Sequence, residues 1–348
     1  MLSSDAAPKP TPVSSGIAGT GAYLPERVVT SGEVEQRLVA ESAVEGFRPR
    51  MGSLLRRSRV IERRYIDPND NVSDLAVRAA RAALENAGLD PGDVPLLIFA
   101  SASQDLIEPA TAHVVSLKLG GSRSVFDVKN ACNSFLNGMQ VADALIRSGQ
   151  YTRALVCTGE APSQVIRWRV SDRRQLKECA VGYTLGDAGA AVVLERRTDG
   201  TGIQHVAFHS GSRHWALCTV PGGGSMSVRD PDHIYFHGHG DLLRAAFEEW
   251  GADQFRQMLL SAGGCLDDYD LVLVHQVSGA LLETFLEITG VRREHTVPIV
   301  DKLGNIASAS IPVQLDMARR EGRIAPGSRI LLVGLGAGIS LGLMTLRA

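Results

Sequence analysis

The 348-residue chain has few aromatic residues, no marked excess of either charge and no long hydrophobic run. Aromatic side chains make up 5% of the sequence, and the formal net charge is −2 at pH 7. Nucleic-acid-binding proteins normally present a concentrated basic face, so this balance predicts no nucleic-acid partner. No apolar stretch approaches the length needed to span a bilayer, and the first residues lack an apolar signal segment. We therefore expect a soluble, cytoplasmic protein without a membrane span.

Cysteine is also scarce, and its spacing excludes two further classes. The chain has an odd number of cysteines and no CxxC pair: Cys132, Cys157, Cys179, Cys218 and Cys265. This pattern indicates neither a disulfide framework nor a zinc knuckle. Six histidines between residues 205 and 239 lack acidic or cysteine partners at regular ligand spacing. We expect no metal site and no cofactor.

Two segments allow more than one interpretation. The basic run at residues 48–59 is either a solvated loop or a contact for an anionic group, such as a CoA phosphate or an acidic carrier protein. Trp168 either packs against its neighbours or faces a pocket or CoA, and packing is the more common role of a buried tryptophan.

The 44% apolar content is enough for one large core or two packed halves. Leu75, Ala79 and Ala83 recur on one face of a pattern that stops at Gly88, which predicts an amphipathic helix. Apolar runs separated by such helical patterns predict an α/β fold with buried, largely parallel sheets. The strand-like runs are PLLIFAS, SVFDV, RALVCTG, GAAVVLE, DLVLVHQ, SRILLVGLG and LGLMTLR.

The second half of the chain repeats the first. An offset of 173 residues superposes one helical segment on another, matching Asp143 with Asp316, Arg147 with Arg320, Gly149 with Gly322, and Cys132 with Asn305. A slightly larger offset superposes RALVCTG on RILLVGL, so the order of strands is repeated too. We predict a disordered tail over residues 1–15 and two similar halves, 16–198 and 199–348, with a site at their interface.

Three residues that follow strand-like runs predict the chemistry. Cys132 follows a small-residue turn and opens a helix, His275 follows an apolar strand, and Asn305 lies in a Gly-Asn turn. A helix N-terminus and a nearby histidine are expected to lower the pKa of a cysteine thiol and so favour its nucleophilic thiolate. Histidine can move a proton and asparagine can donate to an oxyanion. The set indicates acyl-thioester chemistry.

Motifs along nearly the whole chain resemble those of the thiolase superfamily, and within it the ketoacyl synthase III-like condensing enzymes. These motifs are VFDVKNAC, GDAGAAVVLE, LVHQ, KLGNIASASIP and GLGAG. The resemblance implies the thiolase fold, with duplicated halves in five αβαβα layers. It also implies that Cys132 is acylated while His275 and Asn305 bind the carbonyl of a second thioester. The backbone N–H groups of Cys132 and of Ala337, after Gly336, would hold the first acyl oxyanion.

The segment QDLIEPATAHVVSLKLGG resembles the head-to-head condensing thiolases of bacterial olefin and β-lactone biosynthesis, which carry a glutamate before PATA. That residue is Glu108 here. Joining two unactivated thioesters requires removal of an α-proton, and a desolvated carboxylate is a suitable base. The resemblance implies that Glu108 reaches the site from a dimer partner. Alternatively, Glu108 caps the helix that follows Pro109.

We therefore predict a condensing acyltransferase of lipid or specialised-metabolite biosynthesis. It would join two acyl-CoA thioesters without decarboxylation, through a Cys132 acyl-enzyme, to a β-ketoacyl product. A decarboxylating ketoacyl synthase III-like enzyme using a malonyl-carrier protein is one alternative, although the tryptophan with which typical members hold CoA is missing from the N-terminal region. An acyltransferase to a hydroxyl or amine and a non-catalytic partner subunit are others. The expected partners are acyl-CoA or acyl carrier protein and a second copy of the chain or a paralogue.

Overall fold

The computed structural model describes residues 13–49, 52, 56 and 58–348. The strands are β1 (Ser14–Tyr23), β2 (Arg27–Thr30), β3 (Glu62–Tyr65), β4 (Leu96–Ala100), β5 (Ser124–Val128), β6 (Arg153–Glu160), β7 (Ala188–Arg197), β8 (Gly202–Ser210), β9 (Cys218–Thr219), β10 (His237–Gly238), β11 (Leu271–Val274), β12 (Arg329–Gly336) and β13 (Ser340–Arg347). The α-helices are α1 (Ser31–Ser42), α3 (Val72–Ala87), α4 (Thr111–Leu119), α5 (Ser134–Arg147), α6 (Arg173–Cys179), α7 (Gly240–Ala246), α8 (Ala252–Ser261), α9 (Gly279–Thr289), α10 (Val300–Leu303) and α11 (Ser310–Arg320).

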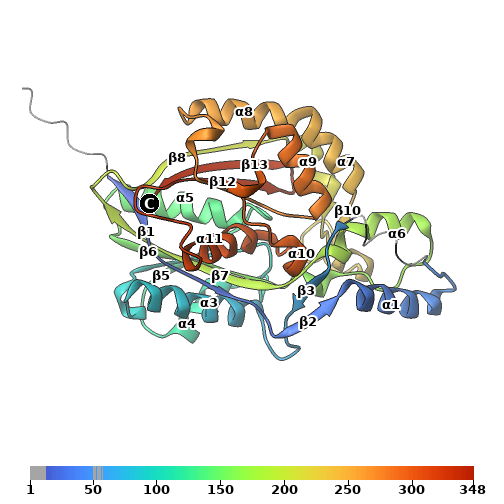
Figure 1. Ribbon diagram of the computed structural model, residues 1–348. Helices are drawn as coiled ribbons and strands as arrows, with labels where there is room; N and C mark the ends of the chain where they lie inside the picture. Colours follow the sequence, from blue (N-terminus) through green and yellow to red (C-terminus); the bar gives the residue numbers. More distant parts are fainter. Residues whose placement is uncertain (1–12, 50–51, 53–55, 57) are drawn as a thin grey trace, which may run out of the picture.

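The elements form five layers (Figure 1). Helices α5 and α11 occupy the middle layer, and their apolar side chains share one buried cluster with strands of both large sheets. Helices α3 and α4 cover the outer face of one sheet, and α8 and α9 cover the outer face of the other. The predicted αβαβα architecture is confirmed.

The two sheets repeat one topology. Their orders are β1-β7-β6-β4-β5 and β11-β12-β13-β8, so β4, β6, β7 and β1 correspond to β11, β12, β13 and β8. Within each sheet the first two of these four strands run parallel, as β4 and β6 or β11 and β12. The two following pairs of neighbouring strands are antiparallel. The expectation of largely parallel sheets is therefore wrong. Strands β7 and β13 return beside the preceding strand in the opposite direction, which an alternation of apolar runs does not reveal.

The middle helices carry equivalent carboxylates, and both bind strand β1. Asp143 on α5 accepts hydrogen bonds from the backbone N–H and hydroxyl of Ser15, at 3.0 and 2.7 Å. Asp316 on α11 accepts from the Thr20 hydroxyl at 2.8 Å. Each carboxylate also pairs with an arginine one turn later, which is Arg147 or Arg320. The matched positions found in the sequence are therefore equivalent in the fold.

Helix α3 forms where the apolar periodicity predicts it. Asn71 and Asp74 form a capping box at its start, and Gly88 ends it with a φ of 66°. A glycine adopts this left-handed conformation without steric cost. Leu75, Ala79 and Ala83 are fully buried. Gly21 of β1 allows close packing, because a Cβ there would lie 2.3 Å from the Ala79 carbonyl oxygen.

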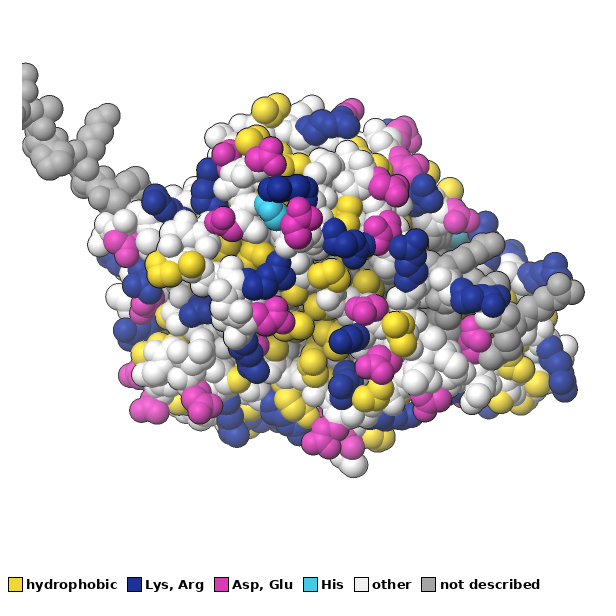
Figure 2. Space-filling model, in the orientation of Figure 1, with side chains coloured by type: hydrophobic (Ala, Val, Ile, Leu, Met, Phe, Trp, Pro, Cys, Tyr) yellow, Lys and Arg dark blue, Asp and Glu magenta, His cyan; other side chains and the backbone are white. Residues whose placement is uncertain are grey.

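The first residues that the structure describes revise the predicted tail. Ser14 and Ser15 are buried in β1, because Ser15 binds Asp143, so an extension of disorder to residue 15 is not supported. The predicted boundary at 198/199 lies in the connection between β7 and β8. Acidic and basic side chains are interspersed over the face in Figure 2. Within the described ranges, every helix is too short or too polar to cross a membrane.

Candidate active site

Cys132 lies in the turn between β5 and α5. Ala131 has a φ of 47°, and α5 begins at Ser134, so the thiol precedes the helix rather than opening it. The neighbouring Asn133 is fully buried and donates its amide to the carbonyl and hydroxyl oxygens of Ser340, at 3.0 and 2.8 Å. The nucleophile turn of the first half is thereby bound to strand β13 of the second half.

The resting thiol differs from the sequence-based expectation. Burial, the nearby Cys218 thiol and the Glu160 carboxylate raise the pKa of Cys132, whereas the backbone N–H groups of Cys132 and Ala337 act in the opposite direction. Burial raises the pKa of a thiol because the charged thiolate loses its hydration. The expected lowering of this pKa by the helix terminus and a histidine is therefore not found.

His275 lies immediately after β11 and explains part of that difference. Its side chain is 3% exposed, and burial lowers its pKa to about 4. Its backbone N–H donates to the carbonyl of Val333 on β12, at 2.9 Å. Neither ring nitrogen has a hydrogen-bond partner within the described part of the chain. The ring is neutral at physiological pH, so it brings no positive charge to the thiol but has an N–H to donate.

Asn305 lies in the Gly-Asn turn between α10 and α11, so it follows a short helix and the predicted strand before it is wrong. Gly304 has a φ of 67°, and a Cβ there would lie 2.3 Å from the Thr184 carbonyl oxygen, so the turn requires glycine. The Asn305 side-chain oxygen accepts from the Ala307 N–H at 3.0 Å. Among the described residues, nothing accepts a hydrogen bond from its amide nitrogen. The amide is therefore oriented with its donor unused.

Buried contacts connect the His275 and Asn305 segments. Gln276, which follows His275, receives hydrogen bonds from Ile299 and Val300 just before the Asn305 turn, at 2.9 and 3.1 Å. Its own backbone N–H donates to Ser310, the first residue of α11, at 3.2 Å. These bonds fix the end of β11 relative to the Asn305 turn.

The glycine-rich end of strand β12 meets the Cys132 turn. A Cβ on Gly334 or Gly336 would lie 1.9 Å or 2.7 Å from the Asn133 and Ser340 side chains, respectively. These glycines therefore allow the C-terminal half to approach the nucleophile turn closely. Ala337 follows directly, and its backbone N–H faces the Cys132 thiol. Both N–H groups favour the thiolate form of Cys132, and their role as oxyanion donors stays a prediction.

Glu108 lies on an exposed connection between β4 and α4. Leu106 and Ile107 beside it are 47% and 72% exposed. The Glu108 carboxylate is also exposed, and no hydrogen bond or ion pair within the described residues uses it. The single chain therefore does not bury Glu108 in an apolar acyl tunnel.

The alternative role of Glu108 as a helix cap is wrong. Helix α4 begins at Thr111, with Ala110 as its N-cap. The Asp127 carboxylate accepts the N–H groups of Thr111 and Ala112, both at 2.8 Å. Asp127 is on β5 beside the helix and satisfies the donors that Glu108 would otherwise have bound.

Sequence reasoning missed two groups next to the nucleophile. Cys218 belongs to the small sheet of β9 and β10 and is far from Cys132 in the chain, so no local pattern reveals the contact. Glu160 ends strand β6 and is fully buried. A charged residue at the end of the apolar run RALVCTGE was the available signal.

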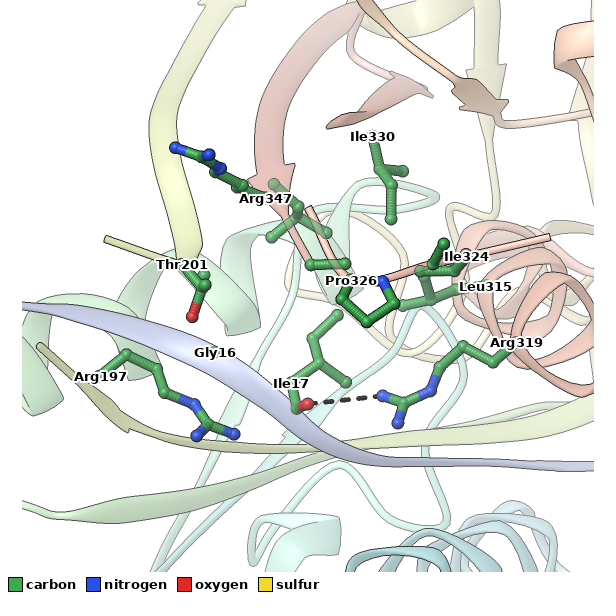
Figure 3. A pocket seen from close by; sticks show the side chains of 14 residues that line it. Gly16, Ile17, Arg197, Thr201, Leu315, Arg319, Ile324, Pro326, Ile330 and Arg347 are labelled. Carbon is green, nitrogen blue, oxygen red and sulfur yellow. Dashed lines mark hydrogen bonds between the residues drawn. The ribbon is translucent and has the colours of Figure 1, made fainter. Parts of the chain in front are cut away.

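Pockets in the described part of the chain include one beside strand β1 and one beside Trp168. One, of about 270 Å³, is lined by Ile17, Ile330 and several arginines, with Arg197 and Arg319 on opposite sides of Ile17 (Figure 3). Ile330 and Ala337 mark opposite ends of β12, so this pocket is remote from Cys132. The second, of about 390 Å³, is lined in part by Trp168.

Trp168 packs and lines a pocket at the same time. The Arg37 guanidinium lies 4.1 Å from its ring centroid, and Tyr183 packs at 6.2 Å. The basic run at 48–59 lies partly outside the described residues, although Arg59 pairs with Glu283 at 3.2 Å. No group of three metal-ligating side chains is present where the structure describes the chain.

Comparison with known protein families gives matches over both halves. Residues 126–212 match the family described as 3-oxoacyl-[acyl-carrier-protein (ACP)] synthase III, and residues 259–348 match its C-terminal family. The chain is 34% identical over 339 residues to β-ketoacyl-[acyl-carrier-protein] synthase III of Symbiobacterium thermophilum, covering 95% of this chain and 97% of that protein. The enzyme of the same name from Desulfitobacterium hafniense is 32% identical over 337 residues, covering 95% and 96%.

Solved structures give a complementary match. A glutamate-to-alanine variant of OleA from Xanthomonas campestris superposes with a TM-score of 0.86 at 27% identity, covering 98% of this chain and 100% of that one. A variant of the same enzyme with bound lauric acid and lauroyl-CoA gives a TM-score of 0.85 at 27% identity, with coverages of 96% and 99%. The sequence relatives and the shared thiolase fold lead to one conclusion: the chain belongs to the β-ketoacyl-[acyl-carrier-protein] synthase III family of condensing enzymes.

Proposed function

We propose that the protein joins two acyl-CoA thioesters by a non-decarboxylative Claisen condensation. Cys132 would be the nucleophile, His275 and Asn305 the donors to the second thioester, and Glu108 the base. The observation that carries the proposal is Glu108, an exposed carboxylate that the described chain uses for neither capping nor pairing. The similarity to OleA over the whole fold supports the same branch.

The first half-reaction forms an acyl-enzyme. The Cys132 sulfur attacks the carbonyl carbon of acyl-CoA, the bond from that carbon to the CoA sulfur breaks, and CoA leaves with the thiol proton. The N–H groups of Cys132 and Ala337 face the sulfur and would stabilise the oxyanion that develops on the carbonyl. Because the thiol pKa is raised, proton loss has to accompany attack rather than precede it.

The second half-reaction forms the carbon–carbon bond. Glu108 takes a proton from the α-carbon of a second acyl-CoA, and His275 and Asn305 donate hydrogen bonds to its enolate oxygen. The α-carbon then attacks the acyl-enzyme carbonyl, and the bond to the Cys132 sulfur breaks. The proton that Glu108 removed returns to this sulfur, which restores the thiol and the carboxylate. The neutral state of His275 suits a donor role, because its pKa of about 4 keeps it uncharged in the working pH range. The product is a β-ketoacyl-CoA.

We further propose that Glu108 acts in a second copy of the chain. Its connection presents Leu106 and Ile107 to solvent, and burial of such side chains against a partner would be favourable by about 25 cal/mol for each Å² removed from water. A carboxylate inserted with them into an apolar site would lose hydration and become a stronger base. A homodimer follows from this arrangement.

A decarboxylating reaction is the second candidate, and the named relatives favour it. Proteins 32% and 34% identical to the chain are β-ketoacyl-[acyl-carrier-protein] synthases III. Decarboxylation of a malonyl thioester generates a carbanion without a base, so Glu108 would then be dispensable.

Intact-protein mass and product analysis distinguish the two. With no malonyl donor present, we expect wild type to gain one acyl group from decanoyl-CoA. Hydrolysis of the β-ketoacyl-CoA product to a β-keto acid, followed by spontaneous decarboxylation, should then give a long-chain ketone. Cys132→Ala should gain no acyl group, whereas Glu108→Gln should be acylated and make no ketone. Glu85→Gln, an exposed carboxylate on α3, serves as the matched control and should behave as wild type.

Acylated wild-type protein that condenses only after malonyl-carrier protein is added would reject the proposed reaction. Equal rates of ketone formation in Glu108→Gln and wild type would reject the role of Glu108.

A further inference from the structure

The Glu160 carboxylate is buried at a junction of three segments. It ends β6 and is fully buried, yet no lysine, arginine or histidine of the described chain lies within ion-pair distance. One oxygen accepts the Ala102 N–H at 2.7 Å and both the N–H and hydroxyl of Ser308, the N–H at 3.3 Å. The other accepts the N–H and hydroxyl of Ser103, at 3.1 and 2.7 Å. Five donors thus replace the water that this carboxylate loses.

Those donors belong to segments that carry other site residues. Ala102 and Ser103 begin the connection that leads to Glu108, and Ser308 lies three residues after Asn305. Ser308 is held further by the Thr158 hydroxyl at 2.8 Å. Glu160 therefore joins two segments through hydrogen bonds. One is the connection between β4 and α4, which carries Glu108 (the Glu108 connection), and the other is the Asn305 turn of the second half.

The carboxylate also lies close enough to the nucleophile to affect it. Its charge contributes to the raised pKa of Cys132, after burial and the Cys218 thiol. A group that disfavours the thiolate does not activate it. Its contribution must come from the geometry that it imposes on the segments around the thiol.

From these contacts we propose that Glu160 is a positioning residue for condensation, holding the Glu108 connection and the Asn305 turn in register around Cys132. This inference rests on the proposed use of Glu108 and Asn305 in the second half-reaction. Glutamine has the same shape, but its NH₂ group would face a backbone N–H on either side, from Ala102 and Ser308 or from Ser103. The substitution therefore loosens one segment whichever way the amide turns.

Separate rates for the two half-reactions test the proposal. In Glu160→Gln we expect acylation of Cys132 by decanoyl-CoA to stay within about threefold of wild type, because its backbone donors are untouched. We expect condensation to fall roughly 10- to 100-fold, because misplaced catalytic groups cost that much. Ser308→Ala removes one anchor and should lower condensation less.

A second readout needs no second substrate: the rate at which iodoacetamide alkylates Cys132, measured by intact-protein mass at a series of pH values. Glu160→Gln removes the nearby charge, so its alkylation profile should move to lower pH, whereas Ser308→Ala keeps the charge and should not move. Asp143→Asn, which disturbs a buried carboxylate away from this junction, controls for stability and should change neither the profile nor the ratio of the two half-reactions.

Equal losses of acylation and condensation in folded Glu160→Gln, or no loss in either variant, would overturn the positioning role. If Glu160→Gln does not fold, the ratio of condensation to acylation rates in Ser308→Ala tests the positioning role instead. If wild type condenses only with a malonyl donor, the proposed function fails. The ratio of the condensation rate to the acylation rate is then measured with that donor. An unchanged ratio in Glu160→Gln rejects the positioning role of Glu160, independently of the proposed function.

Discussion

The two halves of the molecule share a topology but contribute different chemistry. Strands β4, β6, β7 and β1 correspond to β11, β12, β13 and β8, and α5 corresponds to α11. The turn before α5 carries a nucleophile, Cys132, whereas the turn before α11 carries a hydrogen-bond donor, Asn305. The first half also has a fifth strand, β5, which positions the cysteine turn. Duplication supplied two equivalent turns before the middle helices, and the site uses them for different roles.

The equivalent turns also differ in how their polar atoms are satisfied. The Asn305 side chain is fixed by its bond to Ala307 and leaves its NH₂ group free, whereas the Cys132 thiol faces two backbone N–H groups from opposite halves. A donor must point at the substrate, but a nucleophile must be held where an oxyanion can form. The difference predicts that substitutions at matched positions will stop different half-reactions.

The largest expected effect separates Cys132 from Asn305. Cys132→Ala should abolish acylation, whereas Asn305→Ala should be acylated normally and lose condensation by about 10²- to 10³-fold, as for loss of one oxyanion donor. Burst release of CoA followed by ketone formation measures the two steps. Loss of the burst in Asn305→Ala would show that the two turns are not divided in this way.

His275 predicts a pH dependence of stability. Its pKa is lowered from 6.5 to about 4, so between these values the unfolded chain binds more protons than the folded chain. Stability from this group is present above pH 6.5 and falls by roughly 2–3 kcal/mol as the pH drops toward 4. Urea unfolding of His275→Asn should lack that loss relative to wild type.

Asp187 sharpens this prediction, because it should change the stability with pH in the direction opposite to His275. Burial raises its pKa to about 6, although hydrogen bonds from Ser163 and Ile66 act to lower this pKa. The folded chain binds the extra proton here, so stability should fall as the pH rises from 3.8 to about 6, and Asp187→Asn should remove that fall. Identical slopes in wild type and Asp187→Asn would contradict the assignment.

The smallest expected effect compares the middle helices. Asp143 binds two Ser15 groups and Arg147, whereas Asp316 binds Thr20 and an arginine that is 64% exposed. Asp143→Asn should therefore lower the free energy of unfolding by about 2 kcal/mol and Asp316→Asn by about 1 kcal/mol. Urea midpoints measure both, and equal losses would mean that the two helices are anchored equally.

The sequence predicted the parts of this arrangement that follow local periodicity. Strands from β4 to β13 that carry apolar runs, helix α3 and the repeated order of elements were all predicted. Strand β1 was missed because SSGIAGTGAY is rich in glycine and serine, and its glycines are needed for packing against α3. The antiparallel return of β7 and β13 depends on tertiary packing rather than on pattern.

The sequence predicted which residues form the candidate site, but it did not predict the surroundings of their side chains. Cys132 and His275 follow apolar strands, which a sequence shows directly, whereas Asn305 follows helix α10 and not the predicted strand. The raised thiol pKa was not foreseen, because it depends on burial and on Cys218 and Glu160 from distant segments. The roles of Glu108 and of the division at residues 198/199 stay predictions.

A mixed dimer tests the central proposal that Glu108 of one copy serves Cys132 of another. Cys132→Ala and Glu108→Gln chains, each carrying a different affinity tag, are co-expressed and the mixed dimer is isolated by both tags. Each variant alone should make no ketone from decanoyl-CoA. The mixed dimer has one site with Cys132 from one chain and Glu108 from the other, so the account predicts about half the wild-type activity per dimer. An inactive mixed dimer, beside an active mixed dimer of wild type and Cys132→Ala, would contradict it.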